Sequence, residues 1–374
     1  MKMLSLNVRK KCKFNYMLFS LMIILLILGC VFVYSASYYS AEITYGDKGF
    51  FLKKQIIGIG IGFVCFVIFS LIDYHFLSKI KWWLFAATII MLGLVFVPGV
   101  GLTNYGATRW INLRFITFQP SEIAKFAFIV VSSDLLSKNA EKVKSFKGII
   151  PILFIGGIYC LLIIIEPNMS ITICMAMLVV VMLFLGGTKF KHFAILTVPA
   201  IMVVILLILV EPYRLKRLVA FVDPFASKQD EGFQLVQSLL GIALGNMFGV
   251  GVFNSRQKYL FLPFSESDFI FSIIAEETGF IGAISVLILF VFLFITIVKI
   301  GRNAKDKFGF LLACGVGFII IIQVLLNMAV VTGLVPPTGL PLPFISAGST
   351  SIMIFMSMLG VAENVHRQSV LSKI

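Results

Sequence analysis

Long apolar runs without charge are the feature that most constrains this chain. Between Phe308 and Ala362 there is no charged residue, and similar runs recur along the sequence. Only 13% of the 374 side chains are charged, whereas soluble domains carry about 25%. Because a bilayer core about 30 Å thick is crossed by roughly 20 helical residues, the sequence predicts a membrane protein.

The apolar runs predict an all-α membrane protein with about ten transmembrane helices, forming one polytopic domain over residues 1–374. The expected spans are 15–36, 55–72, 82–98, 119–137, 149–165, 169–187, 192–211, 268–298, 308–333 and 345–363. The first run follows a basic segment, as a signal peptide would, but its apolar stretch is too long, so we expect an uncleaved span. Residues 212–267, between the seventh and eighth spans, are expected to form one large loop with a function of its own.

Lysine and arginine are distributed unevenly between the two sides of this topology. With the N-terminus inside, the inner segments carry 19 of these residues and the short outer loops carry five. This bias predicts that both termini are cytoplasmic and that the large loop is extracytoplasmic. The formal net charge of +14 is then explained by topology, and no basic cluster predicts nucleic-acid binding. The expected location is the cytoplasmic membrane, as a multi-pass protein.

The ionisable residues available on each side limit the chemistry. All three histidines, His75, His192 and His366, fall at the inner face, which excludes a His-based metal site or a Ser-His site on the outer face. The inner loops contain no GxxxxGK[ST] or GxGxxG motif for a nucleotide. The six cysteines lack the paired spacing of a disulfide framework or zinc site. We therefore expect an enzyme of this kind to act outside, on an already activated, lipid-borne substrate.

Glu122 and Lys125 are charged residues at predicted membrane depth, where ionisable groups are costly and mark candidate functional sites. They follow Pro120, which suits the first turn of a helix, and their spacing puts them on one helical face. A buried ion pair with no further role is the alternative. The neighbouring polar residues Gln119 and Ser121 are candidate substrate-binding residues.

Two arginines, Arg109 and Arg114, flank Trp110 and its neighbours in the preceding outer loop. Arginine side chains suit the recognition of phosphate or pyrophosphate. Anchoring to lipid headgroups explains them equally well.

The large outer loop contains a predicted amphipathic helix from Gly232 to Gly245. It is expected to lie at the membrane surface or to re-enter shallowly. Its polar face carries Gln234, Gln237 and Ser238, and the basic residues Arg256 and Lys258 follow it.

Asp268 lies at the mouth of the next apolar helix. Partial desolvation there favours a raised pKa and the capacity to act as a general base. The alternative is that Asp268 only caps the N-terminus of the eighth span.

Residues 335–343 are rich in proline and glycine and cannot continue a helix, so they predict a loop between the last two spans. The small hydroxyl residues from Ser346 to Ser351 follow. They suit an anion at a helix N-terminus or close helix packing.

Together these segments resemble the SEDS (shape, elongation, division and sporulation) family, which contains FtsW, RodA and SpoVE. The motifs are Gly106–Ile111, Phe118–Glu122, Asp223–Phe225, Gly232–Gln234, Gln237–Leu239, Asp268–Phe271, Glu276–Phe280 and Leu342–Ser346. Residues 254–259 look more like the FtsW and SpoVE branch than the RodA branch. The chain departs from the usual family pattern at 167–170, 263–265 and 347–349.

The resemblance implies a ten-span peptidoglycan glycosyltransferase that polymerises lipid II on the outer face, in cell division or sporulation. Lipid II is a disaccharide pentapeptide carried on undecaprenyl pyrophosphate. The expected partners are a class B penicillin-binding transpeptidase and other divisome or sporulation membrane proteins. The resemblance also implies that Asp268 matches the essential acidic residue of the family, and that Glu122 and Lys125 match its cavity pair.

On this basis Asp268 is expected to deprotonate the acceptor 4-hydroxyl, with inversion at the donor sugar. Arg109, Lys125 and Arg256 or Lys258 would balance the departing pyrophosphate, and a divalent cation, Mg or Mn, is an optional addition. Further expected substrate contacts are Gln234, Gln237 and Ser238, lining a sugar groove, together with Glu276 and Ser346. Two other hypotheses stay open at this stage: a lipid II transporter, and a non-catalytic scaffold for the transpeptidase.

Overall fold

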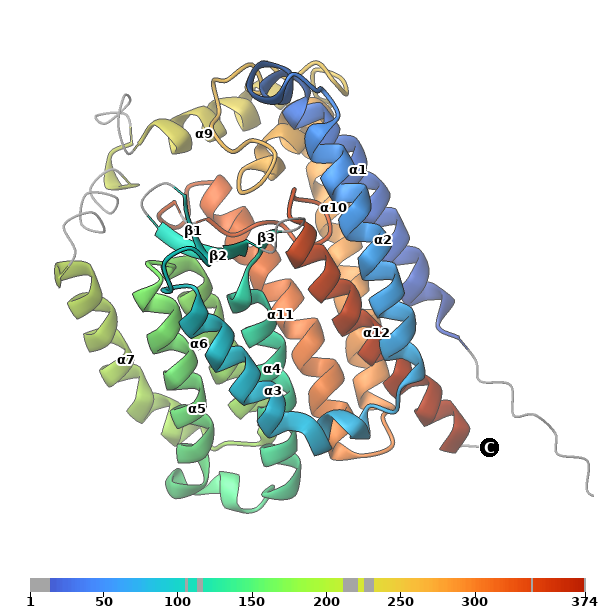
Figure 1. Cartoon of the computed structure of the whole chain (residues 1–374), viewed down its shortest axis with the longest axis vertical. Coiled ribbons are helices and arrows are strands. Elements are labelled where there is room, and N and C mark those ends of the chain that lie inside the picture. Colours follow the sequence, from blue (N-terminus) through green and yellow to red (C-terminus); the bar gives the residue numbers. More distant parts are fainter. Residues whose placement is uncertain are drawn as a thin grey trace, which may run out of the picture.

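The computed structural model describes residues 14–104, 107–112, 117–210, 221–224, 232–337 and 339–372. Long, roughly parallel helices form a bundle, with a small sheet and a short helix gathered at one end (Figure 1). The first helix begins at the opposite end, where the last helix also finishes. Two stretches of the predicted large loop, 212–220 and 225–231, lie outside the described residues.

The described helices cover most of the bundle. Their bounds are α1 Tyr16–Tyr45, α2 Phe50–Leu71, α3 His75–Leu94, α4 Pro120–Lys138, α5 Phe146–Ile165, α6 Met169–Gly186, α7 Phe190–Val210, α9 Phe233–Gly245, α10 Ile270–Arg302, α11 Lys307–Val331 and α12 Ser349–Ser372. A single 3-10 turn, η1, spans Lys142–Lys144.

Helix ends follow local capping chemistry. The Asn15 side chain accepts a hydrogen bond from Leu18 N at the start of α1, and Asp306 does the same for Gly309 N at the start of α11. Pro120 occupies the first turn of α4, where a missing N–H is tolerated. Gly46, with φ of 67°, ends α1 because the left-handed conformation favours glycine.

Each predicted span overlaps one long helix. Seven helices in the described part of the chain are long and apolar enough to cross a membrane by length and composition: α1, α2, α3, α5, α6, α10 and α11. Helix α1 runs nine residues beyond the predicted end, because nothing between Ser37 and Gly46 breaks it. Helix α12 begins at Ser349 rather than 345, since Phe344 adopts a φ of 64° that a helix excludes.

A small antiparallel sheet was not predicted. Its strands are β1 Gly101–Asn104, β2 Ala107–Asn112 and β3 Thr117–Phe118, in the order β1-β2-β3. Leu102 pairs with Trp110, and Ile111 pairs with Phe118. The expectation of a helical protein is right, and the sheet is a local exception that lies over the ends of α4 to α6 (Figure 1).

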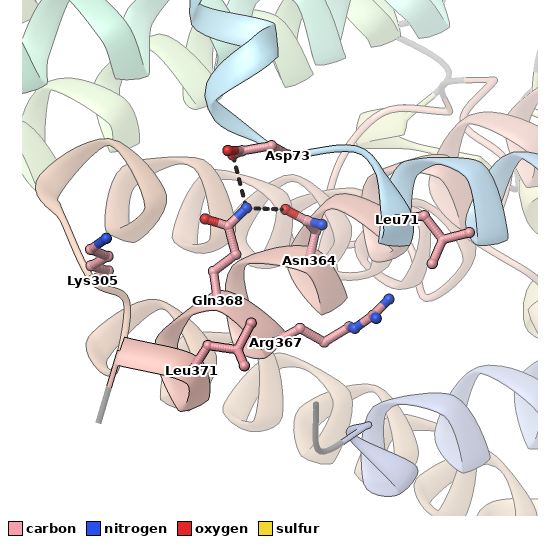
Figure 2. A pocket seen from close by; sticks show the side chains of 7 residues that line it. All are labelled: Leu71, Asp73, Lys305, Asn364, Arg367, Gln368 and Leu371. Atoms are coloured by element: carbon pink, nitrogen blue, oxygen red, sulfur yellow. Dashed lines mark hydrogen bonds between the residues drawn. The ribbon is translucent and has the colours of Figure 1, made fainter. Parts of the chain in front are cut away.

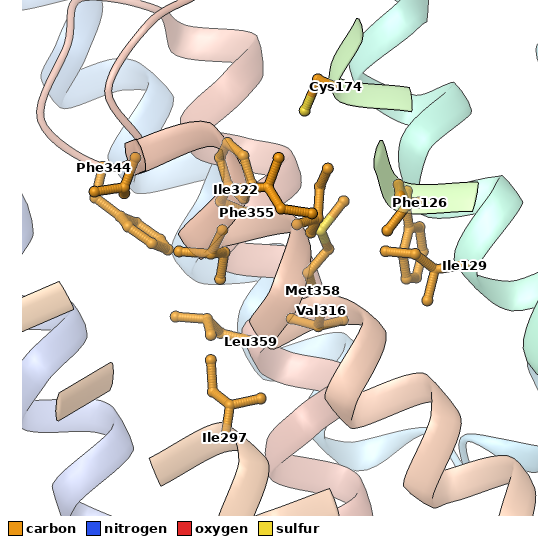
Figure 3. Packing of buried hydrophobic residues seen from close by; sticks show 14 of the residues in the cluster. Phe126, Ile129, Cys174, Ile297, Val316, Ile322, Phe344, Phe355, Met358 and Leu359 are labelled. Atoms are coloured by element: carbon orange, nitrogen blue, oxygen red, sulfur yellow. The ribbon is translucent and has the colours of Figure 1, made fainter. Parts of the chain in front are cut away.

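Helix α11 lies in the core and is the most buried of the seven candidate spans. Val316 and Ile322 of α11 face Phe126 and Ile129 of α4 on one side and residues of α12 on the other (Figure 3). Close packing of this kind fixes the positions of any polar groups carried by α11.

Helix α10 is kinked at Gly279, which has φ of 68° and ψ of −170°. The chain after α9 inserts at this kink: Val250 N donates to Glu276 O (3.0 Å) and Phe280 N donates to Asn246 O (2.9 Å). Gly279 and Gly249 lie so close together that a Cβ added to either residue would clash with the backbone at and around the other. Backbone hydrogen bonds at the kink therefore join the segment after α9 to α10.

Candidate active site

Asp268 lies two residues before α10, and its side chain is half-buried. The N-cap residue of α10 is Phe269, and no side chain caps the helix there. Asp268 therefore stands one residue before the N-cap position of α10, and its interpretation as the helix cap stays an alternative.

The backbone that carries Asp268 is fixed by what we call the carbonyl ladder, the consecutive carbonyls of residues 266, 267 and 268. Each accepts a hydrogen bond from a residue that is distant in sequence. The three bonds are Ala347 N to Glu266 O (2.9 Å), Ser346 Oγ to Ser267 O (2.6 Å) and Asn327 Nδ2 to Asp268 O (2.8 Å). Three donors from α11 and the last loop therefore determine where Asp268 stands.

The Pro/Gly loop before α12 is confirmed as non-helical and supplies two of these donors. Ser346 Oγ also accepts from Leu342 N (2.7 Å), so its hydroxyl is used within the protein. Ser346 is buried and holds the loop to the ladder, and the expectation that it contacts substrate stays a prediction. A Cβ on Gly339 would lie 2.9 Å from Asp268 Oδ2, which places this loop against the carboxylate.

Glu122 and Lys125 form the ion pair that their spacing predicts. Lys125 Nζ lies 2.8 Å from Glu122 Oε1, and both side chains are at most 1% exposed. The ammonium group also donates to Gln323 Oε1 (2.7 Å). Ser351 Oγ, at the start of α12, donates to Glu122 Oε2 (3.4 Å). The pair is thus enclosed by α4, α11 and α12 in this conformation.

Two amides of α11, Gln323 and Asn327, were missed by the sequence analysis. Gln323 Nε2 donates to Pro341 O (2.8 Å), and Asn327 Nδ2 donates to Leu340 O (2.7 Å) as well as to Asp268 O. Two amides four residues apart in an apolar span were the available signal. They connect the Lys125 pair to the Asp268 backbone.

Arg109 lies on β2 and contacts the turn between α5 and α6. Its Nε donates to Glu166 O (3.4 Å), and its guanidinium donates to Pro167 O. The side chain of Glu166 is fully buried. Neither of its carboxylate oxygens has a hydrogen-bond partner among the described residues. Burial raises the pKa of Glu166 to about 8, against the opposing effect of Arg109. Arg114 lies outside the described residues.

Gln119 and Ser121 lie at the start of α4, next to Glu122, and both are buried. Ser121 Oγ has no hydrogen-bond partner in the described part of the chain. Thr350 Oγ1 donates to Thr117 O (2.8 Å), which ties α12 to β3 beside this helix start. Whether Gln119 and Ser121 contact substrate stays a prediction.

The amphipathic helix α9 is confirmed, but its small face does not form an open groove. Ser238 Oγ donates to Val331 O (2.8 Å), and Ser238 O accepts from Ser272 Oγ (2.8 Å). Gly241 and Gly245 pack closely against α10. The Ser238 hydroxyl is therefore used within the protein, and its assignment to a sugar groove stays a prediction. Gln234 and Gln237 are only half-buried, so their assignment stays a prediction.

A second ionic cluster lies at the kink of α10. Glu276 accepts from Arg256 N (2.8 Å) and from the Ser255 hydroxyl. Lys258 Nζ lies 3.3 Å from Glu277 Oε1. Glu276 and Lys258 are buried and paired within the protein, and their assignment as substrate contacts stays a prediction. The Arg256 side chain is exposed and stays a candidate.

Whether a divalent cation binds near Asp268 stays a prediction. Within the described ranges, no three His, Cys, Asp or Glu side chains converge as metal ligands. The nearest carboxylate in sequence, Glu266, has a pKa raised by burial, which favours its protonated form over a ligand.

A cavity of about 410 Å³ lies at the opposite end of the bundle from Asp268. Figure 2 shows its wall, where Gln368 Nε2 bridges Asp73 Oδ1 (2.8 Å) and Asn364 Oδ1 (3.0 Å). Lys305 and Arg367 point to opposite sides of this wall. Because its cations do not converge and it is remote from Asp268, this cavity is not the candidate active site.

The fold and the site define a polytopic membrane protein in which an acidic residue is linked to a buried ionic pair through two amides of α11. A family model described as "Cell cycle protein", which groups FtsW, RodA and SpoVE, matches residues 15–371. The chain belongs to this family.

Two relatives support the same family. The chain is 38% identical over 344 residues to "Probable peptidoglycan glycosyltransferase FtsW" of Geobacter sp. (strain M18), covering 92% of this chain and 94% of the relative. It is 36% identical to "Stage V sporulation protein E" of Bacillus subtilis (strain 168), covering 96% and 99%.

Two solved structures share the fold. A chain from "Structural coordination of polymerization and crosslinking by a peptidoglycan synthase complex" gives a TM-score of 0.79 at 24% identity, covering 95% of this chain and 98% of the other. The rod shape determining protein RodA of Thermus thermophilus gives 0.69 at 22% identity, covering 95% and 97%.

Proposed function

We propose that this chain is a peptidoglycan glycosyltransferase of the cytoplasmic membrane that polymerises lipid II into β-1,4-linked glycan strands. The observation that carries the proposal is the identity with the relative named peptidoglycan glycosyltransferase FtsW, which extends over more than nine-tenths of both chains. A role in cell division or sporulation agrees with the names of the relatives.

The proposed topology has ten spans in one domain, both termini in the cytoplasm, and the 212–267 loop outside. The distribution of lysine and arginine supports it. In this orientation the carbonyl ladder and Asp268 belong to the outer end of the bundle, where a lipid-linked sugar is accessible.

In the proposed reaction, Asp268 accepts the proton of the acceptor 4-hydroxyl as the oxygen attacks C1 of the donor sugar. The donor bond to pyrophosphate breaks on the opposite face, so a single displacement inverts the anomeric centre. The pyrophosphate leaves on its lipid. Exposed Arg256 and the Arg109 guanidinium are the proposed cations that stabilise it, and no step needs a metal.

The proposed role of Lys125 follows from its contacts. Its ammonium is enclosed by Glu122, Gln323 and the ring of Phe355, whose centroid lies 5.5 Å from Nζ. Direct contact with pyrophosphate needs an opening between α4, α11 and α12. We propose that Lys125 holds α4 and α11 together in the substrate-free site, and that Glu122 orients Lys125.

The test is polymerisation of labelled lipid II by purified protein, alone and with a class B transpeptidase. Asp268→Asn removes the base while keeping the side-chain volume, and we expect the rate to fall by about 10²- to 10⁴-fold. Glu42→Gln, a carboxylate-to-amide change at an exposed residue, is the matched control. Unchanged polymerisation by Asp268→Asn would remove Asp268 from the mechanism.

A class B penicillin-binding transpeptidase is the proposed partner, with other divisome or sporulation membrane proteins around the pair. The similarity to a chain of the solved peptidoglycan synthase complex, which is described as coordinating polymerization and crosslinking, supports this assignment. The measurement is co-purification of this protein from detergent with each candidate transpeptidase of the cell. Failure to co-purify with any of them would contradict the proposed partnership.

Lipid II transport is the second candidate, and the buried ionisable residues in α4 and α10 are the observation that favours it. Reconstituted vesicles separate the two functions. Movement of labelled lipid II across the bilayer without polymer favours transport, whereas polymer formed from externally added lipid II favours the enzyme.

A further inference from the structure

Gln323 and Asn327, one turn apart on α11, are the strongest unexplained feature near the candidate site. Both are at most 1% exposed, and they are amides in a helix that is otherwise apolar at this depth. Buried amides need partners, since an unpaired buried polar group costs about 1–3 kcal/mol. Their partners show what these side chains do.

The orientation of each amide follows from its neighbours. Lys125 can only donate, so its 2.7 Å contact requires the oxygen of Gln323 on that side, which turns Nε2 towards Pro341 O (2.8 Å). Asn327 faces two carbonyls, Asp268 O and Leu340 O, so both contacts require its NH2 group. Asn327 Oδ1 is left without a partner among the described residues.

Two sets of hydrogen bonds result, joined by the backbone of residues 340–341. The first runs from Glu122 Oε1 to Lys125 Nζ, to Gln323 and to Pro341 O, and the second runs from Leu340 O to Asn327 and to Asp268 O. Each amide bridges two segments of the chain that are distant in sequence. The same loop brings Gly339 against the Asp268 carboxylate.

Resting on the proposed function, we propose that Gln323 and Asn327 are positioning residues for the glycosyl transfer, which hold the Asp268 backbone and the loop at 339–341 in one arrangement. Asn327 acts directly through the Asp268 carbonyl. Gln323 acts through the loop and takes its own orientation from Lys125. Loss of either amide displaces the base without removing it.

The experiment compares the rate constant and KM for lipid II polymerisation in purified full-length variants. We expect Asn327→Ala to lower kcat by about 10²-fold, since a misplacement of about 1 Å at the reacting centre has an effect of that size, with KM within about twofold of wild type. Gln323→Ala should lower kcat by about 10-fold, because its action on Asp268 is indirect.

Asn364→Ala is the matched control for lost stability. Asn364 is a buried amide of α12 that bonds Ser70 O (2.9 Å) and Tyr74 N (2.9 Å) at the other end of the bundle. It should lower the melting temperature comparably while kcat stays within about twofold of wild type. Equal kcat losses in Asn364→Ala and Asn327→Ala overturn the proposal, because stability alone would then explain both.

The pH dependence of kcat gives a readout that a purely structural role does not change. Asn327→Asp places a carboxylate against two carbonyls, and its kcat profile should shift in apparent pKa relative to wild type because Asp268 has moved. An unshifted profile with full kcat overturns the positioning role. If the wild-type protein itself makes no polymer, the proposed function fails instead, so the two failures are distinguishable.

Discussion

At the scale of single residues, the Glu122–Lys125 pair shows how a buried charge is tolerated. Each charge loses its hydration, and the pair recovers part of that energy only because the ammonium has two acceptors and the carboxylate has two donors. Removing one partner leaves an uncompensated charge at a depth where water is absent.

Lys125→Met should therefore destabilise the protein by about 3–5 kcal/mol, because Glu122 then keeps a charge without its counterion. The double variant Glu122→Gln with Lys125→Met should recover most of that loss, since no charge remains buried. Thermal unfolding in detergent measures both. A double variant less stable than Lys125→Met contradicts this account.

Glu166 gives a pH-dependent prediction. Its pKa is about 8 in the fold and about 4.3 in an unfolded chain, so between these values the folded state holds a proton that the unfolded state has released. Stability must then fall as pH rises from 4.3 to 8. Glu166→Gln should remove this dependence.

The increase in the free energy of unfolding caused by Glu166→Gln should be near zero at pH 4.5. It should grow with pH, to at most about 4 kcal/mol at pH 7.5. Melting temperatures of both proteins across that range provide the check. Parallel pH curves for variant and wild type would show that Glu166 is ionised in the fold.

At the scale of elements, the kink in α10 depends on a glycine. Gly279 has a φ of 68°, and a Cβ there would press on the backbone of Gly249 and Met247. The clash of this Cβ cannot be relieved by moving a flexible side chain, because the atoms that it meets belong to the backbone. The positive φ adds a second cost for any residue other than glycine.

Gly279→Ala should lower the free energy of unfolding by about 2 kcal/mol or more. The control is Gly157→Ala, in the middle of α5, where a new Cβ meets nothing within 4 Å. That change should be neutral or stabilise by up to about 1 kcal/mol. Equal melting temperatures for the two variants would show that the kink is not required.

The elements also show what sequence can predict. Apolar runs locate the long helices because burial in lipid constrains every residue of a span. The strands were missed because β2 has only six residues and no long-range apolar period. The pairing of Asn327 with Asp268 joins residues 59 positions apart, and local patterns carry no information on such contacts. The intramolecular partners of Ser238 and Lys258 were not predicted for the same reason, since they come from other elements.

At the scale of the whole molecule, the orientation of the bundle is the property that determines which face can act on a lipid-linked sugar. Lys48 lies in the turn after α1 and Lys305 in the turn after α10, and the two turns are at opposite ends of the bundle (Figure 1). Both residues are exposed, so each reports on one side of the membrane.

In a cysteine-free background, Lys48→Cys should react with a membrane-impermeant maleimide in intact cells, and Lys305→Cys only after the membrane is permeabilised. The distribution of basic residues sets this expectation. The reverse labelling would place Asp268 at the cytoplasmic side and contradict the proposed reaction.

The length of helix α11 also indicates how deep its residues lie in the membrane. It begins at Lys307 on the cytoplasmic side of the proposed topology, and its rise of about 1.5 Å per residue puts Gln323 about 24 Å and Asn327 about 30 Å above that point. A hydrocarbon core is about 30 Å thick. The contact to Asp268 therefore falls at the outer boundary of the lipid, and the Lys125 contact about 6 Å beneath it. In the proposed function, this depth lets a sugar on a polyprenyl pyrophosphate reach Asp268 at the level of its own headgroup, so that the substrate need not leave the membrane to react.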